Sequence, residues 1–377
     1  MLSRLRWEGW RVRMIVIQLR LVIQEQEYSP DRLPGPRIAI MGLMPKFSVI
    51  IPTYNRAGLV VKALESVLAQ TYAAHDVIVV DDGSTDETAR DIKRYLSERP
   101  EHAVHVDYIY QPNQGKSVAL NQGILRTTGD WFAFLDSDDC WMPDKLETQV
   151  RAIQECGEES RACFTDARYI NNPQLAMTVF ERARMGSTED IGKLADTVKH
   201  LLKPPAGIYV QTPIVPRDLV DKIGGFDPKL RIGEDTDFLF RLALETAFCY
   251  VNRPLVQIDR TPNRAVGIVE HISDDERSHL RQLQYMYEKW LNLIGDSRNE
   301  EKKIILMRLE EVQNGWADCS LDERDYKAAR RALAEAIRIR FTAKTAVKWI
   351  LSHVLPGFTR KLVIRQDSLR KKRQIPA

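Results

Sequence analysis

The chain has 377 residues, 44% hydrophobic and 28% charged, which is typical of a folded globular protein and excludes wholesale disorder. Its net charge of +3 conceals an uneven distribution, because residues 327–377 carry net +12 and the remainder net −9. The five cysteines are odd in number and none has CxxC spacing, which indicates reduced thiols and argues against a zinc site or a disulfide framework.

Residues 1–44 precede the first predicted strand, and we expect a disordered extension or the product of a start misassigned upstream of Met44. Arginines interrupt the apolar run in this segment, and no apolar stretch approaches the ~18–20 residues that a membrane span needs. Arg20 and the lack of a small-residue cleavage site after it argue against a secretory signal. We therefore expect a cytoplasmic protein.

From residue 45 to about 260, short apolar runs alternate with longer amphipathic ones. We predict strands at 47–51, 76–80, 104–110 and 131–135, and helices at 57–70, 85–96, 117–126 and 143–155. Pro52 is expected to end the first strand. This alternation predicts an α/β fold with a parallel sheet and helices on both faces, and ligands in such sheets bind beyond the carboxyl ends of the strands.

The segment from about residue 269 onward has helical spacing, with two helices predicted at 326–337 and 342–354. Their spacing resembles one tetratricopeptide hairpin, but genuine arrays need about three repeats, and the interpretation we favour is an ordinary amphipathic helix packed on the body. We predict three regions: the extension 1–44, an α/β domain at 45–265 with halves at about 45–140 and 141–265, and a helical region 266–377 with a basic tail.

Two acids, Asp136 and Asp138, follow the very apolar strand at 131–135. Carboxylates placed side by side repel each other, and a hard divalent cation that shares them with the phosphates of a ligand removes this repulsion. The alternative is that Asp and Ser simply turn the chain at a strand end.

Three further segments carry polar groups at predicted strand or helix starts. Asp82 lies beside a Gly83 turn, where a carboxylate can accept from a base imide or merely cap a helix. The segment 52–56 offers an aromatic face for a base and a cation for phosphate. Acids at 234–237 open a helix, where its dipole favours one or two of them without explaining all three.

In combination and in this order, the segments IIPTYNR, VIVVDDGSTDET, NQGKSVALNQGI, TGDWFAFLDSDD and GGFD…GEDTDF resemble family 2 glycosyltransferases of the GT-A fold. The resemblance covers residues 46–260. It implies a nucleotide-diphospho-sugar transferase, Rossmann-like, whose mixed sheet is flanked by helices, with a nucleotide-binding half followed by an acceptor-binding half and, here, a helical C-terminal extension.

The resemblance also implies roles for individual residues. The family's donor-contacting positions correspond here to Pro52, Thr53, Tyr54, Arg56, Asp82, Lys116 and Asp136. Among these, Asp82 matches the acid that recognises the imide of the base, Lys116 is the basic residue of the third segment, and Asp136 is the first acid of the DxD motif. Asp138 and Asp136 match the metal-binding acids, with Mg²⁺ or Mn²⁺ as the implied cofactor. Asp235 matches the catalytic base and Glu234 its acceptor-side neighbour.

The resemblance implies the transfer of one sugar with inversion of its anomeric configuration. The donor would be a nucleotide-diphosphate sugar, with UDP favoured, and the acceptor a hydroxyl of a glycan or a lipid-linked saccharide. The implied pathway is polysaccharide or cell-envelope synthesis. Processive relatives carry QxxRW, but here Gln257 and Arg260 are followed by Thr261, which argues against polymer synthesis and leaves both residues the plain role of ending a strand. Two alternatives remain: a polyprenyl-phosphate sugar transferase, and an inactive nucleotide-sugar-binding scaffold.

The basic C-terminal segment has two interpretations. It is either a solvated helix with a disordered tip, or a peripheral contact with the cytoplasmic face of a membrane, since Trp349, Ile350 and Val354 give an apolar face beside Lys344 and Lys348. Nucleic-acid binding is not expected, because no recognised module accompanies the charge.

Overall fold

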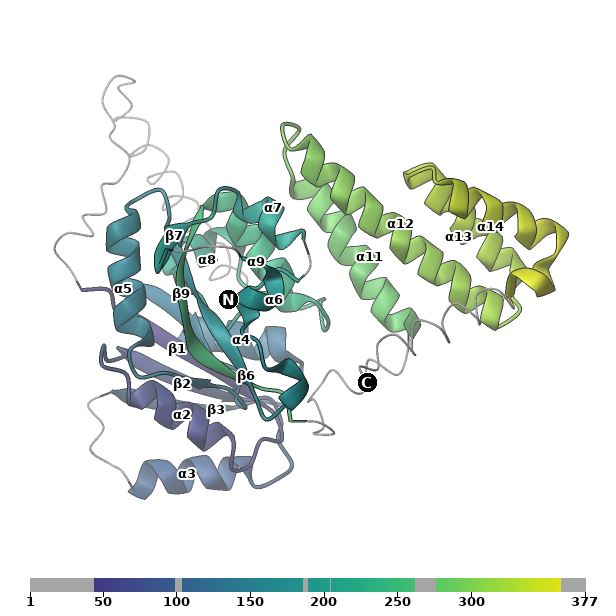
Figure 1. The fold of residues 1–377 in the computed structure, drawn as a ribbon. Coiled ribbons are helices and arrows are strands. Elements are labelled where there is room, and N and C mark those ends of the chain that lie inside the picture. The colour runs from purple at the N-terminus through teal and green to yellow at the C-terminus, as the bar shows by residue number, and fades with distance from the viewer. Residues whose placement is uncertain (1–43, 99–103, 186–188, 204, 262–275, 361–377) are drawn as a thin grey trace, which may run out of the picture. The chain divides into compact units, whose positions relative to one another are not determined.

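A computed structural model describes residues 44–98, 104–185, 189–203, 205–261 and 276–360 (Figure 1). The extension at 1–43, the basic tip at 361–377 and the start of the helical region at 266–275 lie outside these ranges. One sheet organises the α/β part, with strands in the order β3 (His105–Tyr110), β2 (Asp76–Asp81), β1 (Phe47–Thr53), β4 (Trp131–Phe134), β8 (Ile214–Pro216), β6 (Ala162–Ile170), β9 (Phe248–Asp259) and β5 (Cys140–Trp141), and with β7 (Ile191–Lys193) paired to β9. The predicted mixed α/β fold with a helical C-terminal region is confirmed.

The first part of the sheet is parallel. β1 (Phe47–Thr53) lies between β2 (Asp76–Asp81) and β4 (Trp131–Phe134), and β3 (His105–Tyr110) pairs with β2 at the edge. The intervening helices are α2 (Val60–Leu68), α3 (Thr88–Glu98) and α4 (Lys116–Arg126). α4 packs on β1 and β2, where Gly123 permits close approach because a Cβ there would lie 2.4 Å from Ile50 Cγ2. The carboxyl ends of β1, β2 and β4 therefore meet at one edge.

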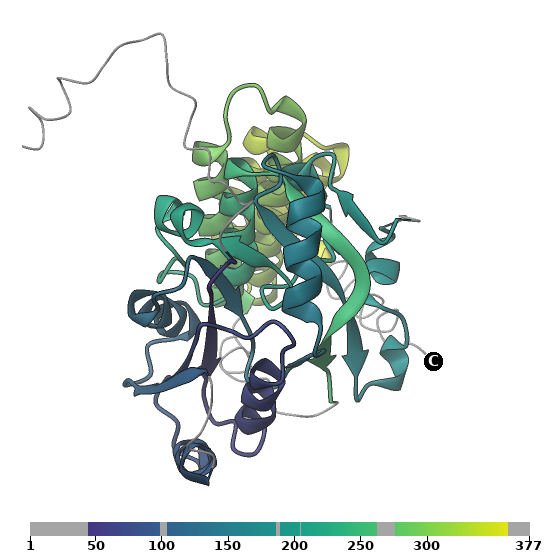
Figure 2. The same ribbon diagram turned by 90° about the vertical axis from the view of Figure 1, so that its left-hand side faces the viewer.

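The second part of the sheet is mixed. β8 (Ile214–Pro216) runs antiparallel to β4 and to β6 (Ala162–Ile170), and β6 runs parallel to the long β9 (Phe248–Asp259). β5 (Cys140–Trp141) and β7 (Ile191–Lys193) pair antiparallel with β9. α5 (Lys145–Cys156) covers β9 and β6, as the turned view shows (Figure 2). The shorter helices are η1 (Pro173–Leu175), α6 (Val179–Ala183), α7 (Thr197–Leu201) and α8 (Arg217–Ile223), followed by the longer α9 (Glu234–Glu245).

Four helices follow the sheet: α11 (Glu276–Leu293), α12 (Asn299–Asp322), α13 (Tyr326–Ile339) and α14 (Ala343–Val354). α11 contacts α9 through Trp290, which is 2% exposed and stacks on Phe240 with ring centroids 4.0 Å apart. Its indole N–H donates to Asp237 Oδ1 at 3.1 Å, and Lys289 pairs with Asp237 Oδ2 at 3.0 Å. Asp237 is wholly buried, so this acid anchors the helical region to the start of α9.

Most predicted elements are found with ends shifted by one to three residues, but Pro52 does not end the first strand. β1 continues to Thr53, and Pro52 pairs with Val80 of β2. β4 pairs with β1 only as far as Ile50. Pro52, which has no N–H, therefore does not need to donate a hydrogen bond to β4. Within the described ranges, no helix combines the length and the apolar character that crossing a membrane requires.

The docking of α11 predicts that Trp290→Ala lowers the free energy of unfolding by about 3–5 kcal/mol, since it leaves a cavity and removes the hydrogen-bond donor to Asp237 Oδ1. Trp349→Ala is the matched control, because Trp349 is 36% exposed on α14 and its loss should cost about 1 kcal/mol or less. Urea unfolding followed by circular dichroism measures both. Equal, small losses would contradict the docking contact.

Candidate active site

Hydrogen bonds join the loop after β1 to the loop after β2. Asn55 adopts the left-handed conformation with φ 51°, its N–H donates to Ser84 Oγ at 2.9 Å, and its Oδ1 accepts from Thr85 N at 2.8 Å. Arg56 N donates to Thr88 Oγ1 at 2.8 Å. The TYNR and DDGSTDET segments, which are about thirty residues apart in sequence, thus form one surface at the strand ends.

Asp82 is 2% exposed and organises the loop that leads into α4. Its two carboxylate oxygens accept from Gln111 Nε2 at 2.7 Å, Gln114 N at 2.8 Å and Gly115 N at 2.8 Å. A carboxylate has about four acceptor positions, so this loop uses most of them. The observed contacts give Asp82 a structural task that the sequence did not reveal, and its contact with a nucleotide base stays a prediction.

Lys116, the first residue of α4, lies among three acids from two separate parts of the chain. Its Nζ is 2.8 Å from Asp136 Oδ1, 3.0 Å from Asp235 Oδ2 and 3.9 Å from Glu234 Oε1. Burial opposes the charged ammonium, but the three carboxylates outweigh it and raise the pKa of Lys116 well above its ordinary value. The lysine is therefore a permanent countercharge to the acids.

Aromatic packing brings these acids together. Phe134 of β4 meets Phe226 and Phe238 edge to face, with centroids 5.2 and 5.5 Å away, and the latter two rings stack at 4.0 Å. Phe134 lies two residues before Asp136, and Phe238 lies about one helical turn after Asp235. The shared core thus fixes the end of β4 opposite the first turn of α9.

α4 is also bonded to the segment that precedes α9. Asn121 exchanges two hydrogen bonds with the Phe226 backbone, at 2.8 and 2.9 Å, and Ser117 Oγ donates to Leu230 O at 2.9 Å. These bonds hold the amino end of α4, and with it Lys116, beside the amino end of α9.

The acids of the 136–139 segment have different surroundings. Burial, together with the charge of Asp136, raises the pKa of Asp138, although Arg56 Nε lies 3.6 Å from Asp138 Oδ2 and opposes the shift. Asp139 is 1% exposed and accepts from Gln211 Nε2 at 2.6 Å and from Asp259 N at 2.8 Å. Asp139 therefore ties this segment to β9, whereas Asp136 and Asp138 remain partly accessible.

The first turn of α9 holds two acids whose pKa values are raised. Burial and the charge of Asp235 raise the pKa of Glu234 to about 7. Burial also raises the pKa of Asp235, with Lys116 opposing and Asp136 adding to the shift. Asp235 Oδ2 is bonded to Lys116, but its Oδ1 is buried without a hydrogen-bond partner. A buried acceptor that lacks a donor is a candidate contact for a ligand hydroxyl.

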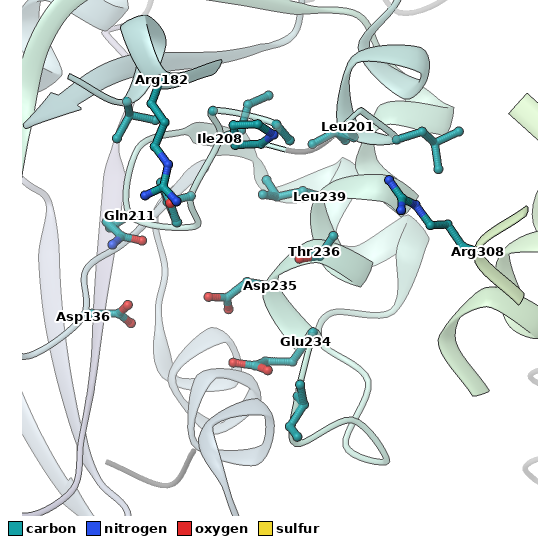
Figure 3. Close-up of a pocket in the computed structure, with 18 of the residues that line it drawn as sticks. Asp136, Arg182, Leu201, Ile208, Gln211, Glu234, Asp235, Thr236, Leu239 and Arg308 are labelled. Atoms are coloured by element: carbon teal, nitrogen blue, oxygen red, sulfur yellow. The ribbon is translucent and has the colours of Figure 1, made fainter. Parts of the chain in front are cut away.

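A pocket of about 600 Å³ contains Asp136, Glu234 and Asp235 among its lining residues (Figure 3). Its other walls come from β6, α6, α7, the 205–211 loop and the helical region, which contributes Arg308. Of the other predicted site residues, Lys116 joins this cluster through ion pairs with Asp136 and Asp235, whereas Arg56 and Asp138 pair with each other. The remaining four lie at the strand ends and do not line this pocket: Pro52, Thr53, Tyr54 and Asp82.

Several lining residues carried no usable signal in the sequence. Arg260 follows the predicted strand end and lines the pocket as well, while Gln211, Arg182 and Arg308 belong to no recognised motif. Only the folded chain brings them to the same cavity as Asp235.

The residues present suit a divalent cation. Asp136 and Asp138 offer hard oxygen ligands, and a cation would relieve their mutual repulsion, which adds to burial in raising the pKa of Asp138. No group of three or more His, Cys, Asp and Glu side chains in the described part of the chain is arranged to hold a metal. The remaining ligands would have to come from a bound phosphate compound.

A family model described as glycosyl transferase family 2 matches residues 48–209. The chain carries a family 2 glycosyltransferase domain. Uncharacterized glycosyltransferases of Rickettsia prowazekii and Haemophilus influenzae share 28% and 29% identity with it over 63% and 67% of this chain, and over 73% and 79% of their own. The family and the enzyme class predicted from the sequence are confirmed.

Two further proteins are similar to this glycosyltransferase. TuaG of Bacillus subtilis, named for teichuronic acid biosynthesis, is 40% identical over 29% of this chain and 43% of its own length. The crystal structure of residues 1–349 of TarS from S. aureus, in complex with UDP-GlcNAc, superposes with a TM-score of 0.61 at 18% identity. The superposition covers 87% of this glycosyltransferase and 92% of the TarS chain, which supports the GT-A fold.

The geometry around Lys116 predicts that Lys116→Met destabilises this glycosyltransferase in a pH-dependent way. Near pH 5 Glu234 is largely protonated, because its pKa is about 7, so fewer carboxylates are left without a countercharge and the loss should be smaller. As the pH rises through about 7, Glu234 ionises without a countercharge, and the loss should reach about 3 kcal/mol.

Lys303→Met is the matched control for this measurement, because Lys303 is exposed and pairs with Glu300 within one helix. Its cost should stay below about 1 kcal/mol at every pH. Urea unfolding at several pH values measures both variants. A pH-independent loss in Lys116→Met would contradict the shared-countercharge account.

Proposed function

We propose that this protein is an inverting, divalent-metal-dependent glycosyltransferase that moves one sugar from a nucleotide-diphosphate sugar to an acceptor hydroxyl in cell-envelope or other polysaccharide synthesis. The observation that carries the proposal is the shared pocket: Asp136, from the end of a parallel strand, and Asp235, from the start of α9, line one cavity and share Lys116. TuaG, named for teichuronic acid biosynthesis, supports the choice of pathway.

Donor binding is assigned to the strand-end surface. Tyr54 would face the nucleotide base, and Arg56 and Lys116 would bind the diphosphate as cations. Asp138, with Asp136, would hold Mg²⁺ or Mn²⁺, which when bound neutralises charge on the leaving diphosphate. UDP is the favoured nucleotide, in line with the UDP-GlcNAc complex of TarS.

Asp235 is assigned the role of base. Its unpartnered Oδ1 would accept the proton of the acceptor hydroxyl, whose oxygen forms a bond to the anomeric carbon as the bond to the diphosphate breaks. A raised pKa makes Asp235 a stronger base, and the charge of Lys116 favours its ionised form. Attack opposite the leaving group inverts the anomeric configuration in one step. Glu234, adjacent and partly accessible, would orient the acceptor.

The role of the base predicts that Asp235→Asn reduces sugar transfer by at least about a thousandfold while donor binding stays within about threefold. Asp138→Asn should instead abolish the Mn²⁺-dependent part of donor binding. A thermal-shift screen of UDP-, GDP- and dTDP-sugars with and without Mn²⁺ identifies the donor, and isothermal titration and a nucleotide-release assay then compare the variants.

Asp218→Asn serves as the control, since Asp218 is exposed on α8 and does not line the pocket. Full activity in Asp235→Asn would refute the assigned base. A wild-type protein that binds no nucleotide sugar would refute the proposed function, and one that binds the donor but never transfers would favour the scaffold.

A peripheral membrane contact through α14 is part of the proposal. Val347, Ile350 and Val354 recur on one side of this helix and are 53–69% exposed, and Phe358 just beyond it is 51% exposed. Apolar side chains on one face, with lysines nearby, suit anionic lipid. Such a contact would bring a lipid-linked acceptor, or the alternative polyprenyl phosphate, to the pocket.

The membrane contact predicts sedimentation with phosphatidylglycerol vesicles at low salt that weakens at high salt. Ile350→Glu should reduce the bound fraction at least about fivefold. Leu125→Glu is the matched control, because Leu125 is 76% exposed on α4 and should leave binding unchanged. No sedimentation of the wild type at low salt would remove this part of the proposal.

A further inference from the structure

The walls of the pocket beyond the catalytic acids carry positive charge. Arg182, Arg260 and Arg308 line it from α6, the end of β9 and α12, which are three separate segments. Its three lining acids, Asp136, Glu234 and Asp235, all lie within 3.9 Å of Lys116, which already balances part of their charge. The space that an acceptor would fill is therefore bordered by guanidinium groups.

Arg182 is the cation best placed to meet a ligand. Its side chain extends into the pocket toward Gln211, on the side where Asp136 lies (Figure 3). The neighbouring acid Glu181 does not neutralise it, because Glu181 accepts from Thr178 N at 2.7 Å in the capping box of α6. The Arg182 guanidinium instead lies over the Tyr169 ring, 5.9 Å from its centroid.

A pair of tyrosine hydroxyls completes this wall. Tyr169 and Tyr209 both line the pocket, and their hydroxyl oxygens are 2.9 Å apart. One hydroxyl donates to the other, so the second keeps a proton to offer. Burial and the bond to Tyr209 raise the pKa of Tyr169 to about 12, so the hydroxyl stays protonated at neutral pH. A guanidinium beside a phenolic donor is a good site for an anionic oxygen.

We propose that the acceptor of this glycosyltransferase carries a phosphate group, and that Arg182 with the Tyr169–Tyr209 hydroxyl pair binds it. The proposal rests on the proposed function, because it takes the pocket beside Asp235 as the acceptor site. Arg308, on the wall formed by the helical region, lines the same pocket but is paired with Glu311, so the phosphate site is assigned to the Arg182 wall. A sugar or polyol phosphate and a lipid phosphate share this chemistry, and the test separates them.

The test compares two pairs of probes by isothermal titration into the full chain at constant ionic strength, with UDP and Mn²⁺ present. Glycerol 3-phosphate is compared with glycerol, and geranyl phosphate with geraniol. At least one phosphorylated probe should bind about tenfold or more tightly than its unphosphorylated partner. Preference within the first pair indicates a sugar or polyol phosphate, and preference confined to the second indicates a lipid phosphate.

Arg182→Gln should abolish this preference, and Tyr169→Phe, which keeps the ring, should reduce it by about threefold or more. Arg338→Gln is the control for Arg182→Gln. Arg338 pairs with Glu335 within α13 and does not line the pocket. Both pocket variants should bind UDP with Mn²⁺ as the wild type does.

Equal binding within both pairs, or a preference that survives Arg182→Gln, would overturn the proposal. Loss of UDP binding in Arg182→Gln would also overturn it, because Arg182 would then bind the donor and not the acceptor. Normal UDP binding without any phosphate preference overturns this inference alone, whereas a wild type that binds no UDP with Mn²⁺ fails the proposed function itself.

Discussion

The site depends on one buried countercharge, the ammonium of Lys116. Asp136 ends a strand of the parallel part of the sheet, and Asp235 opens a helix about a hundred residues later, yet both contact the same nitrogen. Without a cation, these acids could not stay close and ionised in a partly buried pocket. Lys116 thereby makes Asp136 and Asp235, the proposed donor-side and acceptor-side acids, compatible in one cavity, and a bound metal and diphosphate would extend the same principle.

The surrounding structure serves to hold that arrangement in place. The packing of Phe134 on Phe226 and Phe238 aligns the end of β4 with α9, and Asn121 secures α4 to the intervening loop. Asp237 then anchors α9 to Trp290 of α11, so the helical region forms part of the pocket. The acids of α9 differ in their surroundings, because Glu234 and Asp235 line the pocket while Asp237 is buried and supports the fold.

Local patterns predicted much of the fold and the edge of the sheet where the site lies, because strand ends and helix starts can be identified from neighbouring residues. The ion pairs of Lys116 could not be predicted this way, since its contact with Asp235 spans 119 residues. The extent of β1 through Pro52 depended on where β4 separates from it, which is a tertiary feature. Arg182 and Arg308 lie outside every motif, and their shared pocket exists only after α6 and α12 have packed.

The central claim is that a donor diphosphate and its cation bind beside Asp136 and Asp138, facing Asp235 across the pocket. A crystal structure with UDP and Mn²⁺, with the metal located by its anomalous signal, tests this most directly. The account predicts Mn²⁺ on Asp138 or Asp136, the diphosphate next to Lys116, and Asp235 open to the remaining pocket. Metal and diphosphate bound away from these acids, or a base buried beneath the nucleotide, would contradict it.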